Sequence, residues 1–146
     1  MKLSERLKRD EGLRLRLYRC PAGHLTIGYG RNIEERGITP EEAEFILATD
    51  IDLARRDAMI FLGDPATWEY LEPVRQEVLI QMAFNMGLTT LRKFKRFRKA
   101  LLADDFALAA NEMCNSRWAQ QVGKRAVRLA KEMRTGVYVD GHSNNY

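Results

Sequence analysis

The chain has 146 residues, a length that suits one domain or two small lobes sharing a core. Hydrophobic residues make up 45% of it and charged residues 30%, which is typical of a folded globular protein. No stretch approaches the roughly 18 consecutive apolar residues that a membrane-spanning helix needs. The basic start, Met1 to Arg9, lacks the apolar segment of a secretory signal. We therefore expect a protein that stays in the cytosol where it is made.

The net charge of +4 and the isoelectric point near 9.2 favour binding to polyanions. A nucleic acid, an acidic membrane surface and an anionic cell wall all fit this charge. Cys20 and Cys114 lie far apart without metal-ligand spacing, and the chain has only two histidines, His24 and His142. We expect two free thiols in a reducing compartment and no metal or other cofactor.

A short helix is predicted at the start of the chain, because Leu3 and Leu7 have i, i+4 spacing. It ends with Asp10 and Glu11, followed by Gly12. Acidic residues at a helix C-terminus oppose the helix dipole, at a cost of a few tenths to about 1 kcal/mol each. This end is either frayed and solvated, or it keeps a carboxylate in place for chemistry.

A hairpin is predicted next. Alternation predicts a half-buried strand with one apolar side, Leu13, Leu15 and Leu17, and one polar side, Arg14, Arg16 and Tyr18. The turn at residues 20–23 leads into a glycine-containing second strand, residues 24–30. Residues 32–37 hold a polar turn with room for a third short strand.

A long helix is predicted from residue 40 to about residue 61. Thr39, Pro40 and Glu42 provide an N-cap, a first-turn proline and a capping-box glutamate. Apolar residues then recur with helical spacing at Ala43, Leu47, Ile51, Ala54, Ala58 and Phe61. At 1.5 Å per residue this helix would be roughly 33 Å long, enough to connect two lobes.

The rest of the chain, up to residue 134, is predicted to be helical, with the helix from Pro73 to Gly87 at the centre of the core. The predicted fold class is α+β and mostly helical. A small N-terminal lobe with a β-hairpin or three-stranded sheet, plus the connecting helix, takes residues 12–60. Residues 1–11 and 61–136 form the helical lobe, and 137–146 a polar tail. A cleft between unequal lobes would suit a polymer substrate.

Several short blocks occur in an order that resembles one family. They are Glu11-Gly12-Leu13-Arg14, Tyr18, Gly23, Thr26-Ile27-Gly28-Tyr29-Gly30, Phe84-Asn85-Met86-Gly87, Ala109-Ala110-Asn111-Glu112, Ser116-Arg117-Trp118 and Arg134-Thr135-Gly136. The ordered set resembles the phage-type lysozymes, or endolysins, of tailed bacteriophages. The resemblance implies one lysozyme-like domain, residues 1–146. It also implies hydrolysis of the β-1,4 bond between N-acetylmuramic acid and N-acetylglucosamine in peptidoglycan, for host cell lysis.

The resemblance makes Glu11 the general acid, which protonates the leaving glycosidic oxygen. Such an acid must keep its proton near neutral pH, and we expect burial, the helix C-terminus and Asp10 to raise its pKa. Arg125 stands where the family has an arginine near the acid, so we expect Arg125 to orient Glu11. Thr26 matches the hydroxyl that helps to hold the attacking water, although it would also suit a strand as a plain β-favouring residue.

Cys20 departs from the family pattern, which normally has aspartate at this place. Three interpretations stay open: a thiolate of lowered pKa that acts as base or nucleophile, a polar filler while other groups activate the water, or a weakened or inactive relative. The family is generally thought to invert configuration, whereas a cysteine nucleophile would retain it. Relatives with cysteine here are accepted as lysozymes, which favours the first two interpretations.

Further residues are placed by position along the family pattern. Asn32 and Phe84 would line the cleft and bind substrate, although Phe84 would equally suit the core. Arg31 stands where the family often has histidine, and we expect it to pair with Asp50. Trp68 and Trp118 are expected to be core aromatics rather than sugar platforms.

The rival hypothesis is a basic helical module without hydrolase activity, binding nucleic acid or the cell wall. Its evidence is the run from Arg92 to Lys99, six cations interleaved with two aromatic residues. A solvated helix face that helps the enzyme reach an anionic envelope explains the same run. We expect a monomer that acts on peptidoglycan, binds no nucleic acid and does not insert stably into membranes. It would wait in the host cytoplasm for a separate membrane-permeabilising protein, a holin.

Overall fold

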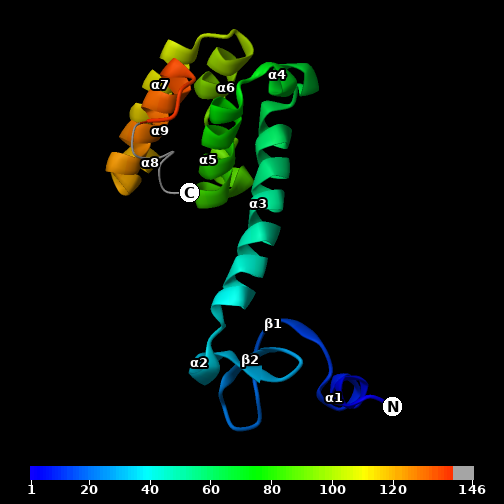
Figure 1. Cartoon of the computed structure of the whole chain (residues 1–146). Helices are drawn as coiled ribbons and strands as arrows, with labels where there is room; N and C mark the ends of the chain where they lie inside the picture. The colour runs from blue at the N-terminus through cyan, green and yellow to red at the C-terminus, as the bar shows by residue number, and fades with distance from the viewer. Residues whose placement is uncertain (140–146) are drawn as a thin grey trace. The chain divides into compact units, whose positions relative to one another are not determined.

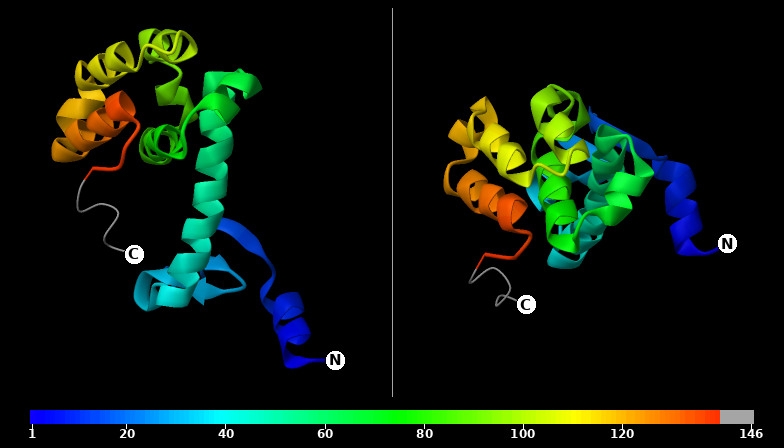
Figure 2. Two further views of the ribbon diagram at one scale, coloured as in Figure 1. Left: turned by 45° about the horizontal axis from the view of Figure 1, so that its top comes forward. Right: turned by 90° about the horizontal axis from the view of Figure 1, so that it is seen from above.

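The computed structural model describes residues 1–139 and divides into two compact units, one from Met1 to Leu47 and one that begins at Ala48 (Figures 1 and 2). The boundary falls inside helix α3 (Pro40–Leu62). Of the predicted tail, residues 140–146, with His142, lie outside the described residues. Among the described helices, none has the length and apolar character to cross a membrane.

The first unit contains a helix, a small sheet and a single helical turn. Its elements before α3 are α1 (Leu3–Glu11), β1 (Arg14–Arg19), β2 (Leu25–Gly28), β3 (Arg31–Asn32) and α2 (Ile33–Arg36). The sheet is antiparallel, in the order β1-β2-β3, so its strands follow one another along the chain. Thr26 on the central strand lies opposite Tyr18 on one side and Asn32 on the other. The predicted hairpin and third strand are confirmed.

The predicted burial of β1 is wrong. Leu13, Leu15 and Leu17 are 52%, 80% and 57% exposed. β1 is an edge strand, and the first unit is too small to supply a layer over its leucine side. Among residues 1–47, Thr26 is the one buried side chain, at 2% exposure. The hairpin is therefore held by its ladder and turn hydrogen bonds more than by an apolar core of its own.

The start of α3 follows its sequence signals closely. The Thr39 backbone N–H donates to Oε1 of Glu42 at 2.8 Å, and the Glu42 backbone N–H donates to Oγ1 of Thr39 at 3.2 Å. This reciprocal pair is the predicted capping box. The helix ends at Leu62, and Gly63 follows with a positive φ of 73°.

The second unit holds the buried core. Beyond α3 it contains α4 (Pro65–Tyr70), α5 (Pro73–Leu91), α6 (Lys95–Leu102), α7 (Phe106–Cys114), α8 (Arg117–Val122) and α9 (Lys124–Thr135). Helices α5, α7 and α9 pack together, with α6 against α7 (Figure 1). The predicted end of α5 at Gly87 is a kink, because Gly87 leaves helical geometry at φ 79° and helical bonding resumes as far as Leu91.

Trp68 and Trp118 are each 5% exposed, so both are core residues as predicted. Arg75 joins α5 to the end of α9: its Nε donates to the Met133 carbonyl at 2.7 Å, and its guanidinium stacks over Phe106. The α+β, mostly helical class is confirmed. The assignment of residues 1–11 to the helical lobe stays a prediction.

Candidate active site

Glu11 is the last residue of α1 and faces Gly30, which follows strand β2. A Cβ atom built on Gly30 would lie 2.6 Å from Oε2 of Glu11. Gly30 also has a positive φ of 76°, which disfavours other residues. Glycine at position 30 therefore leaves the space that the Glu11 carboxylate occupies. Glu11 is exposed rather than buried as expected, since the first unit has no apolar layer over this end of α1.

Cys20 sits in the tight turn between β1 and β2. Its backbone N–H donates to the His24 carbonyl at 3.0 Å, and the Gly23 N–H donates to the Cys20 carbonyl at 2.8 Å. Arg19 braces the turn through a 2.8 Å hydrogen bond to the Gly23 carbonyl. The thiol is partly buried and free.

The turn presents hydrogen-bond donors to the Cys20 sulfur. Hydrogen bonding by the His24 backbone is the main cause that lowers the pKa of the Cys20 thiol, with partial burial opposing it. The Ala22 backbone and the charge of His24 lower this pKa further. Donors that favour the thiolate are what a reactive cysteine requires.

Thr26 lies beside Cys20 in the same hairpin. Its hydroxyl donates to the His24 carbonyl at 2.9 Å, and the side chain is buried. A hydroxyl has one proton to donate and can still accept hydrogen bonds. The structure thus brings Cys20, in the turn, and Thr26, on β2, together in one hairpin, while Glu11 meets Gly30 in the turn between β2 and β3.

His24 forms a contact that sequence reasoning missed. Its Nδ1 lies 3.2 Å from Oε2 of Glu34 and 3.8 Å from Oε1 of Glu35, both on α2. The helix α2 was also missed, although Asn32 with Glu35 three residues later is a usable N-cap signal. In the described part of the chain, no three His, Cys, Asp or Glu side chains are grouped to hold a metal ion.

The contact between His24 and the two glutamates predicts that the stability of the fold depends on pH. The hydrogen bond to Glu34, and then the charge of Glu35, raise the pKa of His24, with burial opposing them. A raised pKa in the folded state stabilises the protein below the ordinary value of about 6.5, and this stabilisation is lost as the pH rises through the raised value. In the His142→Gln background, Glu34→Gln should move the His24 NMR titration midpoint down, whereas Glu41→Gln should leave it in place. An unchanged midpoint in Glu34→Gln would refute the contact.

Arg31 does not have the predicted partner. Its carboxylate partner is Glu42 rather than Asp50, with Nη1 2.6 Å from Oε1 of Glu42. This hydrogen bond is the main cause that lowers the pKa of Glu42 to about 2. The capping box of α3 holds the Glu42 carboxylate in place, close to the end of the sheet. Arg31 therefore pairs with Glu42.

The other predicted site residues have local structural partners. Asn32 caps α2, its Oδ1 accepting from the Glu35 N–H at 3.2 Å. In the second unit, Phe84 is 46% exposed and is therefore not a core residue. Arg125 donates to Oε1 of Gln81 at 3.3 Å, and its role toward Glu11 stays a prediction.

The comparison with known proteins identifies the family. Residues 8–134 match the model of the family described as "Phage lysozyme". The chain is 31% identical over 161 residues to the pre-baseplate central spike protein Gp5 of Enterobacteria phage T4, a match that covers 93% of this chain but 28% of Gp5.

Two further relatives match over most of their own length. A probable T4-type lysozyme of Dictyostelium discoideum is 28% identical, with 92% of this chain and 94% of the relative covered. An endolysin of Acyrthosiphon pisum secondary endosymbiont phage 1 is 32% identical, with 82% and 80% covered. The chain therefore belongs to the phage lysozyme family of cell-wall-degrading glycoside hydrolases.

Proposed function

We propose that this protein is a muramidase that cleaves the β-1,4 bond between N-acetylmuramic acid and N-acetylglucosamine in peptidoglycan. The observation that carries the proposal is the carboxylate of Glu11 lying against Gly30, in the turn after β2, in the unit that also holds Cys20 and Thr26, in a member of this family. A carboxyl group and a thiol of lowered pKa in the same small unit can supply the two functions that glycoside hydrolysis needs: a proton donor, and a base or stabilising group.

In the proposed mechanism Glu11 donates its proton to the glycosidic oxygen as the bond to that oxygen breaks. The positive charge that develops on the sugar is met from the other side by Cys20 and Thr26. If the Cys20 thiolate takes a proton from water while that water attacks, the product has inverted configuration. If the thiolate attacks the sugar carbon itself, water displaces it later and configuration is retained. Anomer analysis of the first product by NMR separates the two routes.

Cys20 can be tested through its chemistry as well as through activity. We expect Cys20→Ala to lower the rate of peptidoglycan hydrolysis by about 100-fold, because a general base contributes roughly 10²–10⁴-fold. Cys20→Asp, which restores the usual family residue, should recover most of the rate. Iodoacetamide at pH 7 should inactivate a Cys114→Ser protein quickly, because the turn favours the thiolate of Cys20.

Cys114 is the matched control for that experiment, since it is also free and is more exposed. In Cys20→Ala protein the remaining thiol, Cys114, should react more slowly despite its exposure. If Cys20→Ala keeps the full hydrolysis rate, Cys20 has no catalytic role. If both thiols react at one rate, the turn does not activate Cys20.

The proposed cellular role is host lysis, with the enzyme held in the host cytoplasm until a separate holin opens the membrane. The support is the family membership and the endolysin relative. The test is loss of turbidity of outer-membrane-permeabilised bacteria. A muramidase lowers the turbidity catalytically, at nanomolar protein. A module that only binds the cell wall would leave it unchanged, and that result would overturn the proposal.

A further inference from the structure

A basic groove lies between the end of α3 and helix α6 in the second unit. Its volume is about 680 Å³, and its lining consists of Ile60, Phe61, Arg92, Lys95, Arg98, Lys99 and Leu102. Four of these seven residues are cations and none is acidic. Lys95 and Lys99 are one helical turn apart on α6, so they lie on the same helix face.

The four cations of the basic groove stand without close acidic partners among the described residues: none of them forms an ion pair with a carboxylate. Arg98 is fixed through Nε, which donates to the carbonyls of Phe61 and Leu62 at 3.1 Å each and so caps the end of α3. The basic groove therefore concentrates positive charge around the fixed side chain of Arg98, and this charge attracts an anion.

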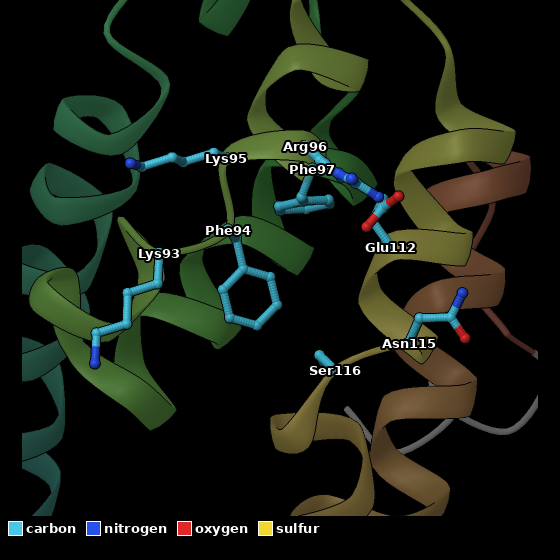
Figure 3. Close-up of a pocket in the computed structure, with 8 residues that line it drawn as sticks. All are labelled: Lys93, Phe94, Lys95, Arg96, Phe97, Glu112, Asn115 and Ser116. Carbon is cyan, nitrogen blue, oxygen red and sulfur yellow. The ribbon is translucent and has the colours of Figure 1, made fainter.

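A neighbouring pocket differs from the basic groove because an acidic residue lines it (Figure 3). It has a volume of about 370 Å³ and is also lined by cations, but Glu112 lines it as well. Figure 3 shows the Arg96 side chain extending toward the Glu112 carboxylate. Arg96 thus has an acidic neighbour, whereas the basic groove, which shares Lys95 with this pocket, has no acidic residue in its lining.

The apolar part of the basic groove restricts its ligand. Ile60 is 52% and Leu102 37% exposed, so two aliphatic side chains stand open beside the cations. The aromatic residue in the lining of the basic groove, Phe61, is 4% exposed and cannot stack on a nucleobase. Single-stranded nucleic-acid sites combine cations with exposed aromatic rings. Cations beside exposed aliphatic side chains instead fit a phosphate headgroup joined to acyl chains.

We propose that the basic groove binds an anionic lipid surface, with phosphate headgroups at Arg92, Lys95 and Lys99 and acyl chains against Ile60 and Leu102. The protein would lie on the membrane without crossing it. Binding of this kind needs neither Glu11 nor Cys20, so it stands apart from the proposed hydrolysis and survives if that proposal fails.

The test uses the full chain with vesicles of phosphatidylglycerol and phosphatidylcholine, and pure phosphatidylcholine vesicles as the neutral reference. Each Lys or Arg near an anionic membrane contributes several-fold in affinity, so Lys95→Gln/Lys99→Gln should weaken binding to the anionic vesicles by about 10-fold or more. The matched control is Lys124→Gln/Lys131→Gln on α9, which removes two exposed lysines and the same charge. It should weaken binding by roughly 3-fold or less, through net charge alone.

A second pair of measurements separates lipid from nucleic acid. Ile60→Ser and Leu102→Ser should each weaken vesicle binding and leave binding to a duplex DNA oligonucleotide unchanged; both side chains are at the surface, and circular dichroism checks that each variant folds. If the two double-lysine variants lose vesicle binding equally, binding depends on the net charge of the protein rather than on the basic groove, and the proposal is wrong. Tighter binding to DNA than to anionic vesicles, lost on removal of Lys95 and Lys99, would overturn it in favour of a nucleic-acid site.

Discussion

Glu11→Gln should lower the rate of peptidoglycan hydrolysis by about 10³-fold, within the roughly 10²–10⁴-fold range of general acid catalysis. Glutamine has the shape of glutamate and can occupy the same place beside Gly30, but it has no acidic proton to donate to the leaving oxygen. The measurement is the initial rate of turbidity loss with outer-membrane-permeabilised bacteria, at matched protein concentration.

Asp10→Asn is the matched control, because it removes one negative charge from the neighbouring position of the same helix end. Asp10 lies 3.3 Å from Nε of Arg9 and is exposed, so its amide variant should keep the rate within about 3-fold, as is usual for exposed ion pairs. A Glu11→Gln protein that lyses at the wild-type rate would contradict the assignment of Glu11 as general acid. Equal losses in both variants would attribute the effect to charge at the helix end.

Gly30→Ala should lower the hydrolysis rate by 10-fold or more, second only to the direct loss of a catalytic group. The new Cβ would stand 2.6 Å from Oε2 of Glu11, which forces the carboxylate to move. Displacement of a catalytic group by about 1 Å can cost about 10²-fold in rate. Because the displaced atom ends a flexible side chain, the clash should change the position of Glu11 more than the stability of the fold.

Gly28→Ala separates that clash from backbone strain. Gly28 has φ 71° against 76° for Gly30, so alanine at either place costs about 1–2 kcal/mol of left-handed strain. A Cβ on Gly28 meets no described atom within 4 Å. Melting temperatures should therefore fall similarly in the two variants, while hydrolysis falls mainly in Gly30→Ala. If the two variants lose activity equally, the contact between Glu11 and Gly30 does not matter for catalysis.

Helix boundaries could be predicted from the sequence because local chemistry decides them. Thr39 with Glu42 forms the expected reciprocal cap, and Pro65 and Pro73 begin helices as their fixed φ favours. Hairpin strands were equally accessible, since the turn at Cys20 and the alternation before it are local signals. These features depend on few residues, all close in sequence.

Features that depend on tertiary surroundings were harder to predict. Alternation in β1 predicted a buried leucine side, but burial also needs a partner layer, and Leu15 is 80% exposed. By sequence spacing, Arg31 could pair with several carboxylates. It pairs with Glu42 because the capping box of α3 holds that side chain in place. His24 and Glu34 are ten residues apart without a shared period, so their contact had no sequence signal.

The candidate site also combines features that the sequence predicts with features that depend on the fold. Position along the family pattern predicts Glu11, Cys20 and Thr26 as the site residues, and their roles stay predictions. The placement of Glu11 against Gly30 and the donors around the Cys20 sulfur come from the fold of the hairpin. The six cations between Arg92 and Lys99 were read as one basic run, whereas helix geometry separates them: four line the basic groove, and Arg96 extends toward Glu112.

The central claim, hydrolysis of a specific glycosidic bond, is tested most directly by the chemistry of the cut ends. Purified peptidoglycan is digested with the protein, the new reducing ends are reduced with borohydride, and the resulting sugar alcohol is identified by mass spectrometry. We predict N-acetylmuramicitol, produced by the wild-type protein and absent from a Glu11→Gln digest. Reduced N-acetylglucosamine, a 1,6-anhydro sugar or released peptide amines in place of N-acetylmuramicitol would contradict the account.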